Sequence, residues 1–190
     1  YKSIPEELHR IVEDISTYDT QYTLQVEEID REAPLYKMRV ERNEAFARLL
    51  YAWLKTNNPD CVIIPNGTIQ EMGIAYRTAK WMGIPVTTYE FGEQRKRIWI
   101  AQNREVMRQE TDDLWEVRKN IPVTEEELEK VREMLGARQR ADLWENFSRR
   151  WQGSAPVGSE RIREELHLDD RPVVFLATNV LGDSLTLGRH

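Results

Sequence analysis

The sequence has few of the residues that disulfides and metal sites require. Cys61 is the only cysteine among the 190 residues, so no disulfide can form within the chain and a zinc site built on cysteines is excluded. The three histidines, His9, His167 and His190, are far apart and adjoin no set of acidic residues, so no metal site is predicted. A single cysteine is typical of a reducing compartment, and we expect a cytoplasmic protein without a resident cofactor.

Long apolar runs and an excess of positive charge are also missing. No segment approaches the roughly 20 apolar residues that a membrane span needs. The start of the chain, residues 1–7, has neither the pattern of a signal peptide nor that of a transit peptide. The formal net charge of -6 argues against binding to nucleic acid. Hydrophobic residues make up 40% and charged residues 32%, which is typical of a globular protein with a well-solvated surface.

Short apolar runs alternate with helical patterns in the first half of the chain. We predict strands over residues 60–65 and 84–91, with a helix over 69–82 between them. A strand, a helix and a strand in this order form a βαβ unit, in which the two strands are parallel. A shorter strand over 97–102 and an apolar strand over 172–178 are also predicted. The predicted fold class is therefore α/β, with a parallel sheet flanked by helices.

Helical patterns cover most of the remaining chain, so we expect a helix-rich protein. The spacing of residues 18–31 also suits a strand, but a helix is the preferred interpretation. Thr124 and Glu127 have the spacing of a capping box, which marks the start of a helix. The expected helices cover residues 5–15, 18–31, 35–55, 111–119, 124–140, 143–152 and 159–166.

A turn of polar residues and glycine follows the first predicted strand. In open parallel sheets, ligands bind at the carboxyl ends of the strands, where Asn66 and Gly67 lie. Asn66 can donate its amide to a sugar hydroxyl or a phosphate, and the N–H groups at the start of the next helix can face the same ligand. The alternative is structural: Gly67 supplies a positive φ to the turn, and Glu71 is a capping or surface residue in the first helical turn.

Glu90 ends the second predicted strand and is soon followed by Gly92. A carboxylate at a strand end can take the proton of an acceptor hydroxyl. Alternatively, Glu90 forms a structural ion pair with one of the basic residues that follow, Arg95, Lys96 and Arg97. Arg95 and Arg97 can themselves bind a phosphate, or they belong to a solvated loop.

Three motifs together suggest a family. They are Pro65-Asn66-Gly67-x-x-x-Glu71, then Gly83-Ile84-Pro85-Val86-x-x-x-Glu90-x-Gly92, and the apolar run from Pro172 to Asp183. Over residues 35–188 the chain resembles bacterial GT-B glycosyltransferases of the capsule and surface-polysaccharide type. The resemblance implies a Rossmann-like, GT-B N-terminal domain with Glu90 as catalytic residue. It also implies that the acceptor substrate is bound by Asn66, Gly67, Glu71, Gly92, Arg95 and Arg97.

The end of the chain resembles the entry to a second, nucleotide-sugar-binding domain. There the resemblance implies that Asn179, Gly182 and Asp183 lie near the donor phosphates, although Asp183 can also simply cap a helix. Most of that second domain is missing, so we expect the chain to be inactive alone. The predicted regions are an acceptor-side domain over 1–153, a linker with a short helix over 154–171, and the start of a second domain over 172–190.

The function implied by the resemblance is sugar transfer from a nucleotide-sugar donor to a glycan or a lipid-linked acceptor. It is compatible with peripheral membrane association and with a homo-oligomer. The alternative is a non-catalytic α/β module that oligomerises or docks a partner through the apolar helix over 143–151. Stabilisation by nucleotide sugars distinguishes the two functions, because only a binding protein gains stability from its ligand.

Overall fold

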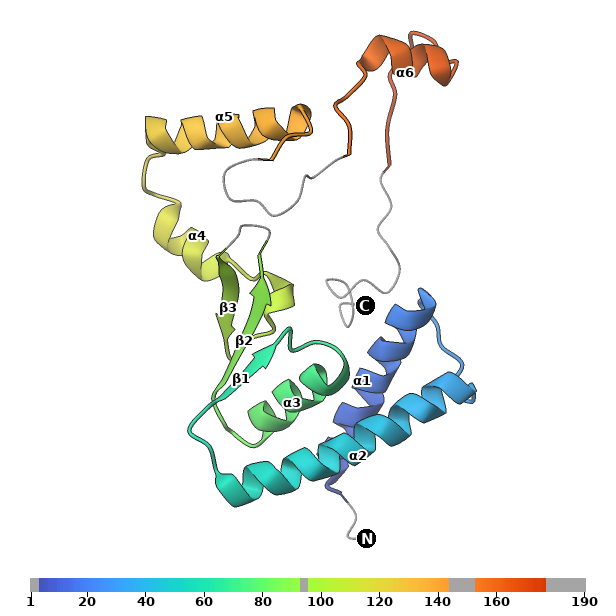
Figure 1. Ribbon diagram of the computed structural model, residues 1–190, viewed down its shortest axis with the longest axis vertical. Helices are drawn as coiled ribbons and strands as arrows, with labels where there is room; N and C mark the ends of the chain where they lie inside the picture. Colours follow the sequence, from blue (N-terminus) through green and yellow to red (C-terminus); the bar gives the residue numbers. More distant parts are fainter. Residues whose placement is uncertain (1–3, 93–95, 144–152, 177–190) are drawn as a thin grey trace. The chain divides into compact units, whose positions relative to one another are not determined.

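The computed structural model describes residues 4–92, 96–143 and 153–176. In this part the protein is a helix-rich α/β protein with a small three-stranded sheet (Figure 1). Residues 4–90 and 99–110 form one compact unit, and 91–92, 96–98, 111–143 and 153–176 form another. These units are defined by contacts within the chain. The domain limits predicted at residues 153 and 171 stay a prediction. Among the helices of the described residues, none combines the length and the apolar composition that crossing a membrane requires.

The first unit contains the predicted βαβ arrangement. Its elements are α1 (Glu6–Leu24), α2 (Pro34–Asn57), β1 (Val62–Pro65), α3 (Gln70–Trp81), β2 (Val86–Phe91), β3 (Ile98–Gln102) and the short 3-10 helix η1 (Val106–Arg108). The last residue of β2, Phe91, and the first of β3, Ile98, are assigned to the other unit. The strand order is β1-β2-β3, and β1 is parallel to β2 with Val62 opposite Val86. Only residues 92–97 connect β2 to β3, too few for a parallel crossover, so this pair is antiparallel and the sheet is mixed.

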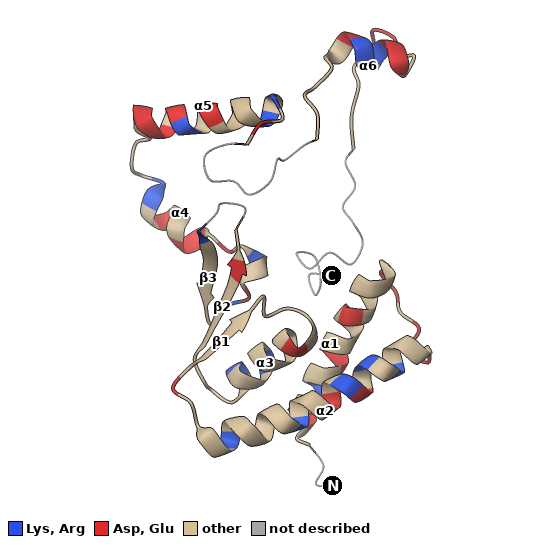
Figure 2. Ribbon diagram, in the orientation of Figure 1, with Lys and Arg blue, Asp and Glu red and all other residues tan. Residues whose placement is uncertain are grey.

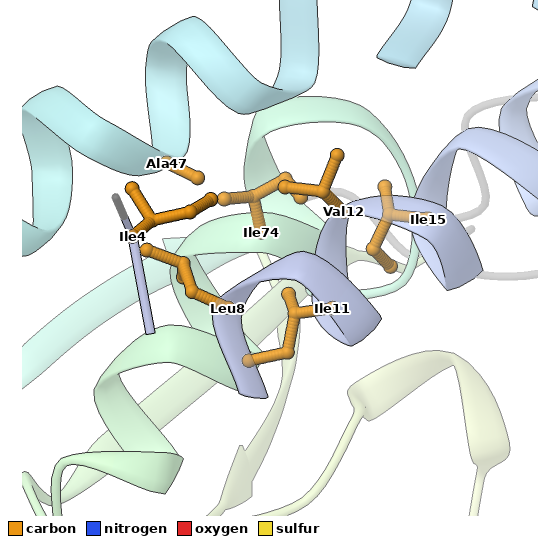
Figure 3. Close-up of a cluster of buried hydrophobic side chains, with 7 residues drawn as sticks. All are labelled: Ile4, Leu8, Ile11, Val12, Ile15, Ala47 and Ile74. Carbon is orange, nitrogen blue, oxygen red and sulfur yellow. The ribbon is translucent and has the colours of Figure 1, made fainter. Parts of the chain in front are cut away.

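Two apolar clusters hold this unit together, and α3 contributes to both. In the first, α1 buries an apolar stripe at helical spacing against Ala47 of α2 and Ile74 of α3 (Figure 3). The second joins Leu54 of α2 and Tyr76 of α3 to strand residues such as Val86. Helix α3 therefore lies between the other two helices and the sheet. Its packing on both sides fixes its position relative to β1 and β2.

The start of α3 approaches its neighbours so closely that only glycine fits at one position. A Cβ atom on Gly73 would lie 2.6 Å from the carbonyl oxygen of Thr68 and 2.6 Å from Cδ1 of Ile15. The first contact is with backbone, which cannot move aside without shifting the turn before α3. Gly73 thus permits the close contact between α1 and the segment that leads from β1 into α3.

The predicted helix over 18–31 is correct only as far as Leu24. There α1 ends, and Gln25 adopts a left-handed conformation with a φ of 56°. The side-chain amide of Gln21 donates to the carbonyl oxygen of Glu27 at 2.6 Å, which folds the chain back on itself. Beyond this point the sequence offers few apolar side chains to bury, so no packing offsets the exposed polar surface of a further helical turn.

The predicted strand over 172–178 is not formed in residues 172–176, the part of it that is described. Val174 is 92% exposed and Phe175 is 86% exposed. An apolar, β-branched run favours a strand, but a strand also needs a neighbour that takes up its backbone hydrogen bonds. These residues do not belong to the three-stranded sheet. Of the predicted helix over 143–152, residues 144–152 lie outside the described residues.

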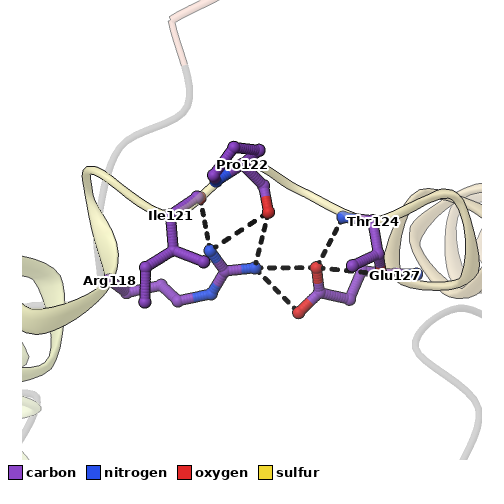
Figure 4. A network of polar contacts seen from close by, with 5 residues as sticks. All are labelled: Arg118, Ile121, Pro122, Thr124 and Glu127. Atoms are coloured by element: carbon purple, nitrogen blue, oxygen red, sulfur yellow. Dashed lines mark hydrogen bonds and ion pairs between the residues drawn. The ribbon is translucent and has the colours of Figure 1, made fainter.

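The second unit contains three helices, α4 (Asp112–Arg118), α5 (Glu125–Gln139) and α6 (Ser159–Glu165). The predicted capping box of α5 is confirmed: the backbone N–H of Glu127 donates to Thr124 Oγ1 at 3.2 Å, and that of Thr124 donates to Glu127 Oε2 at 2.8 Å. The guanidinium of Arg118 donates to both oxygens of Glu127, at 2.8 and 2.7 Å, and to the carbonyl oxygens of Ile121 and Pro122 (Figure 4). This network joins α4 to the start of α5.

The capping network predicts a pH dependence of α5. The Thr124 backbone N–H, and then Arg118, lower the pKa of Glu127 from 4.5 to about 2. Because the folded pKa is depressed, the stabilisation is complete above pH 4.5 and is lost as the pH falls from 4.5 towards 2. We expect faster amide exchange in the first turn of α5 over this pH range, and Glu127→Gln should show it already at neutral pH. Glu133→Gln, an exposed change in the same helix, is the control and should leave exchange unchanged.

The contact at Gly73 predicts a loss of stability on adding a methyl group. Gly73→Ala should destabilise the first unit by about 1–3 kcal/mol, because the new Cβ cannot avoid the Thr68 backbone. Gly136→Ala in α5 is the matched control, since its Cβ would meet only the flexible end of Arg140 at 3.0 Å. That variant should be neutral or more stable by up to about 1 kcal/mol. Urea unfolding measures both, and equal effects of the two substitutions would contradict the role assigned to Gly73.

Candidate functional site

Asn66 and Glu90, two residues of the predicted site, lie side by side at the carboxyl ends of β1 and β2. The parallel register places Pro65 opposite Tyr89, and the backbone N–H of Asn66 donates to the carbonyl oxygen of Tyr89 at 2.8 Å. The side-chain amide of Asn66 then donates to Glu90 Oε2 at 3.3 Å. Both side chains are partly buried. The sheet thus holds the backbone of these two residues in place, and their side chains remain partly accessible.

The turn after β1 has a conformation that restricts its residue types. Asn66 and Gly67 both have positive φ angles, 59° and 86°. The side-chain oxygen of Asn66 accepts the backbone N–H of Thr68 at 3.0 Å, so the asparagine stabilises its own turn. A Cβ atom on Gly67 would lie 2.7 Å from Cγ2 of Thr88. Gly67 therefore has the structural role considered from the sequence, which is to supply a positive φ to the turn. The Asn66 amide nitrogen still faces Glu90.

Glu90 is the single charged residue in the three strands. β1 and β3 carry no charged side chain, and β2 carries only this carboxylate, near its end (Figure 2). The sheet is otherwise apolar or neutral, and the charges of the first unit lie mainly on its helices. At the end of the central strand, this carboxylate accepts a hydrogen bond from the side-chain amide of Asn66.

Glu71 points towards α2 and pairs with a cation there. Its carboxylate accepts a hydrogen bond from Arg42, and the two side chains are 40% and 41% exposed. This hydrogen bond is the main cause that lowers the pKa of Glu71 below its usual 4.5. No contact joins Glu71 to Asn66 or Glu90 among the interactions of the described residues. The ion pair joins α3 to α2, which is the surface role considered for Glu71 from the sequence.

Asp19 is a residue of this region that the sequence analysis did not single out. It is only 2% exposed, and its Oδ1 atom accepts the backbone N–H of Gln70, the first residue of α3, at 2.7 Å. Its other oxygen accepts the Asn43 side-chain amide at 3.1 Å. The residue before α3, Ile69, has no side chain that can cap the helix, so Asp19 of α1 supplies the missing acceptor.

Burial raises the pKa of Asp19 above its usual 3.8. The hydrogen bonds from Asn43 and Gln70, and the charges of two arginines of α2, Arg39 and Arg42, oppose part of that rise. One feature of the sequence could have pointed to Asp19: it follows Ile15 by four residues, on the apolar stripe of α1. An acidic residue on a buried stripe indicates a buried polar contact, but its partner 51 residues away could not be read from spacing.

Of the remaining predicted site residues, the structure describes only Gly92 and Arg97. Gly92 and Arg97 belong to the second unit, where Gly92 is partly exposed and Arg97 is exposed. Arg95, Asn179, Gly182 and Asp183 lie outside the described residues. Within the described ranges, no group of three or more His, Cys, Asp and Glu side chains is arranged to hold a metal ion.

Comparison of the chain with known proteins assigns it to no family. Searches of family models, curated proteins and solved structures found no match. What the site can do chemically therefore follows from its residues. It offers a carboxylate that can accept a proton, an amide that can donate a hydrogen bond, and a turn of fixed conformation that holds the amide in place.

The buried Asp19 predicts a specific response to pH. Because its folded pKa is raised, the folded state binds more protons than the unfolded state just above pH 3.8, and stability falls as the pH rises through this window. Asp19→Asn keeps an oxygen that can accept the Gln70 N–H and does not titrate, so its stability relative to wild type should rise through the same window. Asp19→Ala removes the acceptor and should cost about 1–3 kcal/mol.

Urea unfolding at a series of pH values, from below 3.8 to 7, measures these differences. Asp14→Asn, an exposed change on the same helix, controls for the loss of a negative charge. A constant difference between wild type and Asp19→Asn at every pH would contradict the assignment. So would an alanine variant as stable as the asparagine variant.

Proposed function

We propose that this chain is part of a glycosyltransferase that moves a sugar from a nucleotide-sugar donor to a glycan or a lipid-linked acceptor. The observation that carries the proposal is the pair of Asn66 and Glu90 at the carboxyl ends of adjacent parallel strands. This is the edge of a parallel α/β arrangement at which ligands generally bind. In this proposal β1, α3 and β2 belong to the Rossmann-like N-terminal domain of a GT-B enzyme.

Glu90 is the general base of the proposed reaction. The oxygen of the acceptor hydroxyl attacks the anomeric carbon of the donor sugar, and the bond from that carbon to the phosphate oxygen breaks. The proton of the hydroxyl passes to the Glu90 carboxylate, while the leaving phosphate takes the electron pair. General base catalysis of this kind contributes about 10²–10⁴-fold to a rate. The nucleotide diphosphate that leaves is held by residues outside this site.

Asn66 positions the acceptor and the base. Its amide nitrogen, 3.3 Å from Glu90 Oε2, fixes the orientation of the carboxylate. When the acceptor binds, the same amide can also donate to a neighbouring hydroxyl of the sugar. The positive φ values of Asn66 and Gly67 keep the turn in one conformation, which reduces the ordering that binding requires.

The contact of Asp19 with α3 favours an acceptor hydroxyl over a phosphate at this site. A free helix N-terminus attracts anions through its N–H groups. Here the Gln70 N–H already donates to a buried carboxylate, whose negative charge opposes a second anion. An uncharged hydroxyl group meets no such repulsion. This supports an acceptor-side role for the first unit, with the donor phosphates bound elsewhere.

The proposal predicts that Glu90→Gln abolishes most transfer. In the natural protein that contains this chain, donor-dependent sugar transfer should fall about 10²-fold or more, because glutamine cannot take the proton. Glu13→Gln, an exposed acid on α1 of the same unit, is the matched control and should keep wild-type activity. The measurement is release of nucleotide diphosphate from a panel of nucleotide sugars, with both variants checked for unchanged folding.

Transfer by Glu90→Gln within a few-fold of wild type would show that Glu90 is not the base. The same nucleotide-sugar panel in a thermal-shift assay separates the two functions considered from the sequence. Stabilisation by at least one donor supports the transferase. No stabilisation by any donor favours the non-catalytic interaction module instead.

A further inference from the structure

A second pocket lies within the first unit and shares no lining residue with the Asn66–Glu90 site. It is bounded by α1, by the C-terminal half of α3 and by the segment that precedes η1, and its volume is about 370 Å³. Ligand pockets typically range from about 300 to 1,000 Å³, so this one is of a size for a small ring compound. Neither the predicted site residues nor the proposed reaction uses it.

Hydrogen bonds to the sheet fix the walls of this pocket. The hydroxyl group of Tyr76 on α3 donates to the carbonyl oxygen of Asn103 at 3.2 Å, and the Asn103 backbone N–H donates to Val86 of β2 at 2.7 Å. The backbone N–H of Val106 donates to the buried Thr88 hydroxyl at 2.9 Å. These contacts hold the segment that carries Glu105, one wall of the pocket, against α3 and β2. The pocket is thus preformed rather than dependent on a ligand.

The pocket is lined by three acidic and three basic side chains, and four of these six form two pairs of opposite sign. Arg77 donates to Asp14 at 2.7 Å, and Arg10 pairs with Glu7 at 2.6 Å. Paired in this way, they give the pocket no strong preference for a charged ligand. They still offer carboxylate oxygens as acceptors and guanidinium N–H groups as donors in fixed positions, because one pair does not use all five donors of an arginine. Such a set of donors and acceptors matches a group of neighbouring hydroxyls.

Aromatic rings supply the apolar part of the pocket. Tyr76 is buried, whereas Trp81 is 40% exposed and packs against Tyr51 with ring centroids 5.7 Å apart. The Tyr51 contact steadies the indole, and its exposed part gives a ligand an apolar surface. Lys80 donates to the Tyr76 hydroxyl at 3.1 Å, so its ammonium group lies close to the same surface.

We propose that this pocket binds an uncharged saccharide unit, with one face of the sugar ring on Trp81 and its hydroxyl groups bound by Asp14, Arg77 and Lys80. A sugar ring has an apolar face of C–H groups and a rim of hydroxyls that both donate and accept, which is the combination this pocket presents. The binding involves no chemical step and does not require Glu90. It gives the first unit a second contact with carbohydrate, beyond the reacting sugar.

The test is binding of maltose and lactose, as uncharged probes, to the full chain, followed by NMR of its backbone and tryptophan indole N–H groups. Saturable shifts are expected for Trp81 and for the backbone around Asp14 and Lys80. Trp81→Ala should weaken binding about fivefold or more, a typical loss for an aromatic contact. Trp53→Ala removes an exposed tryptophan of the same unit that does not line the pocket, and it should change nothing.

Asp14→Asn tests the polar wall at an exposed side chain, and it should also weaken binding. Sulfate serves as an anionic probe. Absence of saturable binding of both sugars, binding of sulfate at these residues without the sugars, or equal losses in Trp81→Ala and Trp53→Ala would each overturn the proposal. Glu90→Gln should bind the sugars like wild type, so a failure of the proposed transfer reaction can be told apart from a failure of this pocket.

Discussion

A hydrogen bond between distant parts of the chain fixes the start of the helix that the first unit is built around. The backbone N–H of Gln70 donates to Asp19, a carboxylate of α1 that is almost completely buried. A helix start normally takes its acceptor from a neighbouring Ser, Thr, Asp or Asn, and α3 has none. Because α3 contributes to both apolar clusters, the placement of its first turn decides how α1 and α2 sit against the sheet. Burial disfavours the charged form of Asp19, and the hydrogen bonds from Asn43 and Gln70, together with the nearby arginines, offset part of this cost.

The same contact determines the geometry of the candidate site. The turn from Asn66 to Ile69 is held at one end by the pairing of β1 with β2 and at the other by the anchored start of α3. Gly67 in this turn and Gly73 in the first turn of α3 allow approaches that a Cβ atom would prevent. The Asn66 amide therefore has little freedom, and it faces the one carboxylate of the sheet. A site held in this way is ordered before the ligand arrives, which is what efficient positioning of an acceptor hydroxyl requires.

Local patterns predicted most of the elements and the edge of the sheet where Asn66 and Glu90 lie, but not the contacts between distant segments. The helix over 35–55, the βαβ unit and the capping box of Thr124 and Glu127 depend on spacing within a few residues, and all three are present. Asn66 and Glu90 could be placed at the same edge of the sheet from the sequence, because both lie at the carboxyl ends of strands that were predicted to be parallel. Asp19 could not be assigned, since its partner is set by the packing of α1 on α3. The strand over 172–178 was predicted from its composition alone, but residues 172–176 have no strand to pair with.

Amide hydrogen exchange at Gln70 tests most directly whether Asp19 holds the start of α3. First-turn amides of a helix have no acceptor within the helix and normally exchange fast. If the buried carboxylate accepts the Gln70 N–H, this amide should exchange about as slowly as that of Ile74 in the interior of α3, and Asp19→Ala should remove the protection. Exchange of the Gln70 amide as fast as that of the exposed residues 27 and 28, with Ile74 still protected, would contradict the central role of this contact.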